Sequence, residues 1–378
     1  MTVRLIPMET PPPSADLHFR PTGFVDAPFG LDGQVIRLAG GLLWFSAFEV
    51  IASEGGRRVA APLVPVAGLD DFLAGLSDAQ AETARETIAR IEAPRAPLTL
   101  GERTLRLDEP RVAAILNVTP DSFSDGGKHE GDPQAAADAG FAQSTTGAAL
   151  IDVGGESTRP GAADVWEDDE IERTRPVIER LARSGVAVSI DTRKAAVMEA
   201  ALEAGAAMVN DVSGLRFDER AVELVAKAGC PVVIMHHAGG KGDLHAEPSY
   251  ADPLIEVYDW LADRIDALVA AGIDRVKIVV DPGIGFGKGV AHNLSIINGL
   301  ALFHGLGCPI MLGASRKRFI GALANEAPVE ERLGGSLAVT LAGAGQGAQL
   351  LRVHDVAETV QALKVWRGMR DQALTPVA

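Results

Sequence analysis

The chain has 378 residues, 47% of them hydrophobic, which is enough for one large domain with an appendage or for two domains. Lys and Arg number 35 against 51 Asp and Glu, and the net charge of −16 argues against general binding to nucleic acid or to an anionic membrane. The two cysteines, Cys230 and Cys308, each precede a proline and an apolar run, so we expect buried thiols in a reducing cytoplasm.

The longest uncharged stretch, residues 333–351, is rich in glycine and small polar residues. It predicts a buried helix and strand rather than a membrane span. The first residues lack a continuous apolar signal region and contain three consecutive prolines, Pro11 to Pro13. We therefore expect a cytoplasmic protein with no membrane partner.

Residues 1–110 are predicted to form a small α+β segment of unknown role. FSAFEVIASEGGRRVAAPLVPV (45–66) alternates around a Gly-Gly pair and predicts a β-hairpin. DDFLAGLSDAQAETARETIARIEA (70–93) predicts one amphipathic helix, and LTLGERTLRL (98–107) predicts a second short hairpin. We expect the segment to pack on the rest of the chain without supplying a catalytic group, its second hairpin plugging one end of a barrel.

Residues 111–378 have a different pattern, in which eight short apolar runs alternate with stretches of helical periodicity. The runs are residues 112–118, 149–153, 186–190, 207–212, 232–235, 276–280, 310–312 and 349–353. This count predicts a (β/α)₈ barrel of the TIM type. A doubly wound sheet is the alternative, but it usually has a glycine-rich turn after its first strand, where this chain has the polar loop TPDSFSDGGKHEGD.

Polar residues follow every predicted strand. In chain order they include Asn117 and Asp121, Asp152 and Thr158, Asp191, Asn210 and Asp211, His236 and His237, Asp281, Ser315 and Lys317, and Arg352 and His354. A single Asp in such a place is often a helix cap. Eight strand ends that all carry such groups indicate a site at the C-terminal face of the barrel.

Part of this set suits a flat heterocycle. Asp191, Asn210, Asp281 and Lys317 offer donors and acceptors, and a carboxylate can accept two parallel N–H bonds from an amino-pyrimidinone edge. Phe286 lies among flexible glycines and can cover a ring face. DPGIGFGK (281–288) itself has neither the spacing of a P-loop nor that of a dinucleotide fingerprint.

A second part suits a diphosphate and a hard cation. Arg352 and His354 can bind phosphate oxygens, and Asn117 can serve as one protein ligand of Mg²⁺, which takes its other ligands from phosphate and water. Zinc at His236 and His237 is a weaker alternative, because adjacent histidines diverge and no Cys or Glu lies at ligand spacing.

Seven motifs of this chain resemble those of the dihydropteroate synthase family. They are ILNVTPDSFSDGG (115–127), DVGGESTRPGA (152–162), SIDTRK (189–194), VNDVSG (209–214), DPGIGFGK (281–288), GASRK (313–317) and RVHDV (352–356). The resemblance implies a transferase of folate biosynthesis. It would join 6-hydroxymethyl-7,8-dihydropterin diphosphate to p-aminobenzoate, giving 7,8-dihydropteroate and pyrophosphate. It also implies Mg²⁺, a homodimer, small-molecule partners, sulfonamide inhibition, and movable loops at Asp121 and Arg159.

The resemblance also implies roles for individual residues. The pterin contacts would be Asp191, Asn210, Met235, Asp281, Phe286 and Lys317. The p-aminobenzoate side and its loops would include Asp121, Thr158, Arg159, Pro160 and Ser315. Asn117 would bind Mg²⁺ and, with Arg352 and His354, the diphosphate; Asp191, Lys317, Arg352 and His354 would carry the chemistry.

The chain departs from the family pattern at Ala314, where Thr is usual, and at His237, where Met is usual. The nearest alternative is a methyltetrahydrofolate-type methyltransferase barrel, which shares the pterin-binding positions but needs no diphosphate site. Another alternative is a non-catalytic pterin-binding paralogue. The presence of TPDSFSDGG, STRP and RVHDV argues against the methyltransferase, and the presence of Asn117, Arg352 and Lys317 argues against the non-catalytic paralogue.

Overall fold

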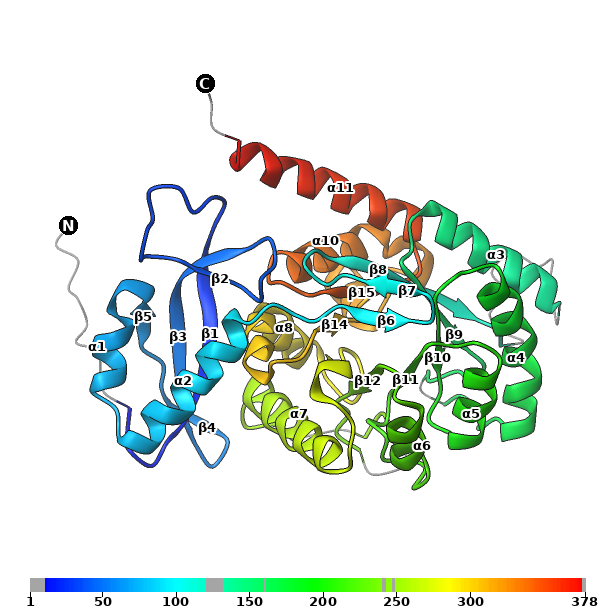
Figure 1. The fold of residues 1–378 in the computed structure, drawn as a ribbon, viewed down its shortest axis with the longest axis horizontal. Coiled ribbons are helices and arrows are strands. Elements are labelled where there is room, and N and C mark those ends of the chain that lie inside the picture. Colours follow the sequence, from blue (N-terminus) through cyan, green and yellow to red (C-terminus); the bar gives the residue numbers. More distant parts are fainter. Residues whose placement is uncertain (1–10, 120–131, 160, 240–242, 247–248, 376–378) are drawn as a thin grey trace.

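A computed structural model describes residues 11–119, 132–159, 161–239, 243–246 and 249–375. A small α+β unit built from the first part of the chain lies beside a larger barrel (Figure 1). No helix in the described ranges is both long and apolar enough to cross a bilayer.

The larger part is a parallel barrel of eight strands, in the order β13-β12-β11-β10-β9-β8-β15-β14. The strands are β8 (Arg111–Asn117), β9 (Leu150–Gly154), β10 (Val188–Asp191), β11 (Met208–Asp211), β12 (Val232–Met235), β13 (Ile278–Asp281), β14 (Met311–Leu312) and β15 (Leu350–Val353). A parallel bridge between Val280 and Ile310 joins β13 to the β14 side and closes the ring. The predicted (β/α)₈ fold is confirmed, with strand positions within two residues of the apolar runs.

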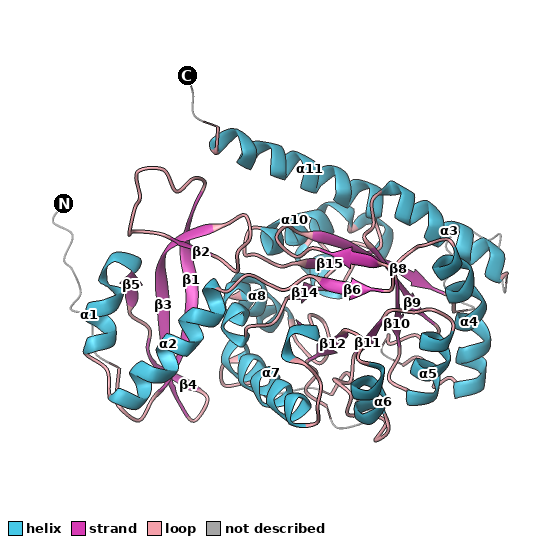
Figure 2. Ribbon diagram, viewed as in Figure 1, coloured by secondary structure: helices cyan, strands magenta, loops and turns pink. Residues whose placement is uncertain are grey.

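Helices surround the strands on the outside of the barrel (Figure 2). They are α3 (Pro133–Thr146), α4 (Glu167–Arg183), α5 (Ala195–Glu203), α6 (Ala221–Ala228), α7 (Pro253–Ala270), α8 (Val290–Asn298), α9 (Arg318–Leu323), α10 (Leu333–Ala344) and α11 (Val356–Ala373). The uncharged stretch 333–351 forms α10 and β15, as its composition predicts. Because strands buried on both faces need apolar residues throughout, the short unbroken runs were a sufficient guide to them.

The first part of the chain forms an antiparallel sheet with two helices. Its strands are β1 (Asp16–Val25), β2 (Ile36–Arg37), β3 (Trp44–Glu54), β4 (Arg57–Ala60) and β5 (Leu63–Pro65), followed by α1 (Leu69–Ala74) and α2 (Asp78–Glu92). The hairpin at Gly55–Gly56 joins β3 to β4 as predicted. The single helix predicted over 70–93 is wrong: α1 ends at Ala74 with Gly75 as its C-cap, and Ser77 caps the start of α2 by accepting a hydrogen bond from the Gln80 N–H.

The second hairpin, β6 (Leu98–Leu100) and β7 (Arg103–Leu105), plugs the barrel at the N-terminal ends of its strands. Its side chains Leu98, Leu100, Leu105 and Leu107 form one buried cluster with an inward-facing layer of the barrel. That layer takes a residue from every strand or its edge: Ala113, Leu150, Ala187, Met208, Val233, Val279, Met311 and Leu350. The hairpin therefore lies opposite the C-terminal face, as predicted.

The α+β unit docks on the side of the barrel, against α7 and the 3₁₀ segment Leu300–Leu306, every residue of which is buried. His18 Nε2 lies 2.7 Å from Asp259 Oδ1 on α7. Arg95 Nη2 donates to the His304 carbonyl at 3.0 Å. Ile51 of β3 belongs to the core cluster of the barrel. On the barrel side these contacts are made by α7 and the 3₁₀ segment, not by the strand-end residues of the predicted site.

Candidate active site

Asp152 is the hub of the polar network at the C-terminal ends of β9, β10, β11 and β15. Its Oδ2 accepts hydrogen bonds from Arg352 Nε at 2.6 Å and from Asn210 Nδ2 at 2.9 Å. Its Oδ1 accepts one from Ser189 Oγ at 2.5 Å. The sequence placed Asp152 at a strand end but assigned it no role, so this residue was missed. The signal was present, since Asp152 opens the motif DVGGEST.

Arg352 bridges Asp152 to Asp191, whose Oδ2 accepts from Arg352 Nη2 at 2.5 Å. The structure thus places Arg352 with the predicted pterin residues rather than apart from them. Burial raises the pKa of Asp191 and the Arg352 guanidinium opposes that shift. Burial alone would lower the pKa of Arg352, but the two carboxylates outweigh it and raise the pKa. Two carboxylates thus bind one guanidinium in this Asp152–Asp191–Arg352 triad.

Asp281 and Lys317 form the opposite side of the site. Asp281 Oδ1 accepts a hydrogen bond from the Gly283 N–H at 2.7 Å. Burial raises the pKa of Asp281 while Lys317 opposes the shift, and burial lowers the pKa of Lys317 to about 8. Gly313 lies between this side and Arg352: a Cβ there would lie 3.4 Å from Asp281 Oδ2 and 3.8 Å from Arg352 Cδ. Asp281 and Arg352 therefore lie on either side of Gly313.

Two aromatic rings, Phe286 and His245, lie beside Lys317, and we call them the aromatic wall. The Lys317 ammonium donates to the Ile284 carbonyl and lies 4.3 Å from the centre of the Phe286 ring. His245 stacks parallel to Phe286, with ring centres 5.5 Å apart. Met235 and Phe286 share a small apolar cluster with Val212 and Leu244. The structure thus brings together the six residues predicted to contact a pterin.

The lysine of the glycine-rich loop 281–288 is bound by backbone carbonyls of the loop and of His236. Lys288 Nζ donates to the carbonyls of Gly283 at 2.9 Å and of Phe286 and His236 at 3.2 Å, and it lies 3.0 Å from His236 Nδ1. Gly283, with φ of +72°, lies so close to the residue that follows β12 that a Cβ would be 1.9 Å from the His236 carbonyl oxygen. The hydrogen bonds of Lys288 therefore fix the conformation of the loop that carries Phe286.

The residues predicted for p-aminobenzoate are distributed over two places. The Thr158 carbonyl accepts from His245 Nε2 at 2.7 Å, which joins its loop to the aromatic wall. Ser315 Oγ instead lies 3.1 Å from His354 Nδ1. Arg159 is exposed beside a cavity of about 220 Å³ that Thr158, Arg193 and His245 also line. Asp121 and Pro160 lie outside the described residues.

Asn117 ends β8 with its amide half-buried, and within the described chain that amide forms no hydrogen bond. A Cβ on Gly154 would lie 3.3 Å from Asn117 Oδ1, so the oxygen faces the adjacent strand end. His354 is neutral, because burial and then Arg352 lower its pKa to about 4. Mg²⁺ that is bound to phosphate needs few protein ligands. The amide oxygen of Asn117 and the neutral imidazole of His354 therefore fit a phosphate-bound Mg²⁺.

The two departures from the family pattern are both buried. Ala314 packs in the barrel core. His237 is 1% exposed, and neither of its ring nitrogens has a hydrogen-bond partner in the described chain. Burial lowers the pKa of His237 to about 4, which keeps the ring neutral and makes it a space-filling side chain in the place of a methionine.

Comparisons with known proteins agree with this geometry. Residues 113–354 match the family model for pterin binding enzymes. The dihydropteroate synthase of Escherichia coli K12 is 45% identical over 263 residues, covering 69% of this chain and 92% of the relative. The Xanthomonas albilineans dihydropteroate synthase solved with 4-aminobenzoic acid is 47% identical with a TM-score of 0.69, covering 74% of this chain and all of that one. The Yersinia pestis enzyme solved with a sulfonamide drug is 43% identical with a TM-score of 0.69, covering 73% and 99%. The chain belongs to the dihydropteroate synthase family of pterin-binding transferases.

Proposed function

We propose that the residues around Asp152, Asp191, Asp281 and Lys317 carry out the reaction of this family, the joining of a dihydropterin diphosphate to p-aminobenzoate. The observation that supports this best is the convergence of three carboxylates, one arginine and one lysine on a space walled by Phe286. Carboxylates bind the N–H edge of an aminopyrimidinone in the way they bind a guanidinium. Lys317 can donate to a ring oxygen or nitrogen.

In the first step the bond between the pterin methylene carbon and the bridging oxygen breaks, and its electron pair leaves with pyrophosphate. The methylene carbon then carries positive charge that is delocalised into the ring. The Asp191 carboxylate stabilises that cation, and because Arg352 fixes it before the reaction it needs no reorganisation.

In the second step the amine nitrogen of p-aminobenzoate attacks the methylene carbon and then releases one proton. An arylamine is already neutral at pH 7, so no strong base is needed. Neutral His354 can donate an N–H bond to the departing pyrophosphate. Asn117 would hold Mg²⁺, which would offset charge on the diphosphate oxygens.

The experiment that tests this function follows pyrophosphate release by the purified protein with the pterin diphosphate, p-aminobenzoate and Mg²⁺. Steady turnover should need both substrates and Mg²⁺, and excess EDTA should abolish it until Mg²⁺ is restored. Full activity in excess EDTA would overturn the proposed role of Asn117. A protein that binds the pterin but never releases pyrophosphate would be a non-catalytic paralogue.

A sulfonamide should compete with p-aminobenzoate and not with the pterin diphosphate. The reason is that Thr158 and Arg159 lie on a loop of their own, joined to the aromatic wall through His245. Initial rates at varied concentrations of each substrate distinguish the two patterns. Competition with the pterin diphosphate alone would show that the loop does not form the second subsite.

We further propose that the enzyme is a cytoplasmic homodimer, as the family resemblance implies. Cys230 is half-buried and Cys308 is buried, and both are free thiols, which suits a reducing compartment. Light scattering of the purified protein measures the mass, and a monomer mass across micromolar concentrations would contradict the dimer.

A further inference from the structure

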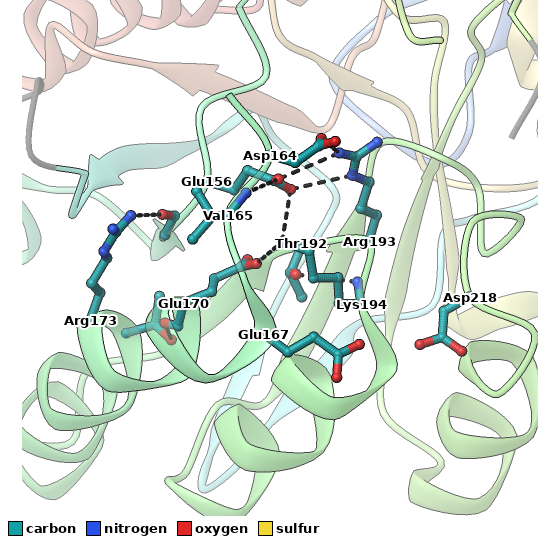
Figure 3. Close-up of polar contacts among 12 residues, drawn as sticks. Glu156, Asp164, Val165, Glu167, Glu170, Arg173, Thr192, Arg193, Lys194 and Asp218 are labelled. Atoms are coloured by element: carbon teal, nitrogen blue, oxygen red, sulfur yellow. Dashed lines mark hydrogen bonds and ion pairs between the residues drawn. The ribbon is translucent and has the colours of Figure 1, made fainter. Parts of the chain in front are cut away.

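The loop that carries Thr158 and Arg159 begins and ends at one buried ionic cluster, which we call the base cluster (Figure 3). The base cluster comprises Glu156, Glu170, Arg193 and Lys194. All four side chains are 10% exposed or less. They come from three places: the loop after β9, helix α4, and the segment directly after Asp191 at the end of β10.

Glu156 ties the two ends of the loop together. Its carboxylate accepts a hydrogen bond from the Val165 N–H at 3.2 Å, so the residue that starts the loop binds the residue that ends it. Arg193 reinforces this closure. Its Nε and Nη2 lie 3.3 and 3.4 Å from the Glu156 carboxylate, and Nη2 also donates to Asp164 Oδ1 at 2.9 Å. One guanidinium therefore spans both ends of the loop (Figure 3).

The rest of the cluster fixes this closure to the barrel. Lys194 Nζ lies 3.2 Å from Glu156 Oε2 and donates to Glu170 Oε2 at 2.6 Å. Arg193 also lies 4.2 Å from the centre of the Phe217 ring. Two carboxylates and two cations balance, so the cluster has no net charge.

Between its ends, by contrast, the loop is exposed at residues 159 and 161–164. Arg159 is exposed, and Gly161 adopts a φ of +79° with nothing within 4 Å of the place where a Cβ would stand. Besides the base of the loop, the described bonds at this pair are the one from His245 to the Thr158 carbonyl and those that Arg159 makes with Ser157 and Ala162 inside the loop. Buried ion pairs are weak evidence for stability, because desolvation offsets much of their attraction. Their position here points to control of loop conformation.

Resting on the proposed function, we propose that Glu156 and Arg193 are positioning residues for the second substrate. They hold the base of the loop so that Thr158 and Arg159 meet the arylamine, although neither Glu156 nor Arg193 contacts it. Because Arg193 lies two residues after Asp191, the same segment fixes the pterin carboxylate and the loop of the other substrate.

The test measures the KM of each substrate and the Tm of Glu156→Gln and Arg193→Lys. Glutamine keeps the acceptor for Val165 but not the charge, and lysine keeps the charge but not the fork that reaches Glu156 and Asp164 together. Both variants should lower kcat/KM for p-aminobenzoate by about 10- to 100-fold. The KM for the pterin diphosphate should stay within about twofold. The double variant should be no worse than the more damaged single one, since both changes remove one interaction.

Matched controls come from the exposed pair beside the cluster. Glu167 and Arg220 lie 3.5 Å apart with side chains 45% and 65% exposed, and Glu167→Gln and Arg220→Lys should leave both KM values unchanged. If Glu156→Gln does not fold, Asp164→Asn tests the same closure of the loop, because Asp164 is the other partner of Arg193. Its side chain is 90% exposed, so the change should spare folding and still raise the KM for p-aminobenzoate severalfold.

Three results would overturn the proposal. They are a fall in Tm with both KM values unchanged, an equal rise in both KM values, or an unchanged KM for p-aminobenzoate in Asp164→Asn and Arg193→Lys. Each of these requires an active wild-type enzyme. Wild-type protein that releases no pyrophosphate with both substrates would instead contradict the proposed function.

Discussion

Asp191→Asn should lower kcat/KM by about 10²–10³-fold while changing the melting temperature far less. The carboxylate is one of two that bind Arg352, and an amide in its place cannot carry a negative charge. A cation that develops on the pterin methylene then loses its stabilising field. Folding should suffer less, because Asp152 still pairs with Arg352 at 2.6 Å and the amide keeps the shape of the side chain.

Lys317→Ala tests the opposite side of the site in the same experiment and should cost a similar factor. The exposed residues Asp138 and Lys364 provide the matched controls Asp138→Asn and Lys364→Ala, which should behave as wild type. Single-turnover pyrophosphate release separates binding from chemistry, and circular dichroism reports the fold. If either site variant kept near wild-type kcat/KM with an unchanged melting curve, its assigned role would be wrong.

Much of the site could be predicted because a parallel barrel converts sequence position into spatial position. Every strand ends at the same face, so Asn210, Asp281 and Arg352 had to converge once their strands were identified. The strands were easy to identify because both faces of each are buried and their apolar runs are unbroken. The hairpin 98–107 was equally clear, since its alternation has a single turn at Gly101.

What the sequence could not provide was the pairing of side chains across strands. Arg352 was grouped with the diphosphate because arginine suits phosphate, yet the structure places its guanidinium between Asp152 and Asp191. Asp152 was missed for the same reason: its partners Ser189, Asn210 and Arg352 lie on three other strands. His245 lies in a segment with no periodicity, and only the fold brings it to Phe286.

The α+β unit shows the same limit in its backbone. Strand β1 pairs with β3 along its length, but Pro21 and Gly23 interrupt its apolar pattern and hid it. Proline is tolerated there because β1 lies at the edge of the sheet, where a missing N–H breaks no ladder on the open side. Helix α1 is too short to show a period of its own.

Deleting residues 1–94 should destabilise the enzyme strongly and leave its chemistry intact. The deletion exposes the 3₁₀ segment Leu300–Leu306, all of which is buried in the full chain, and removes the contacts of His18 with Asp259 and of Arg58 with Asp252. Each Leu or Phe side chain returned to water costs about 1.5–3 kcal/mol. The melting temperature and the solubility should both fall. The protein that remains folded should keep kcat within about tenfold, or roughly 1.4 kcal/mol in barrier, because among the described residues the ion pairs of the deleted part with the barrel are made by Asp252 and Asp259, not by strand-end residues.

A second truncation, of residues 1–108, separates the two ways in which the first part of the chain supports the barrel. It removes the hairpin β6–β7 as well, and with it the four leucines that cover the inner layer of the strands. The α+β unit covers one side of a barrel that is otherwise complete, whereas the hairpin fills the end of the barrel itself. We therefore expect the shorter deletion to yield a weaker but active enzyme and the longer one to yield no cooperative unfolding transition by calorimetry. A 1–94 deletion that is folded by circular dichroism yet inactive would show that the α+β unit reaches the active site. A 1–108 deletion as stable as the 1–94 deletion would show that the hairpin does not support the barrel.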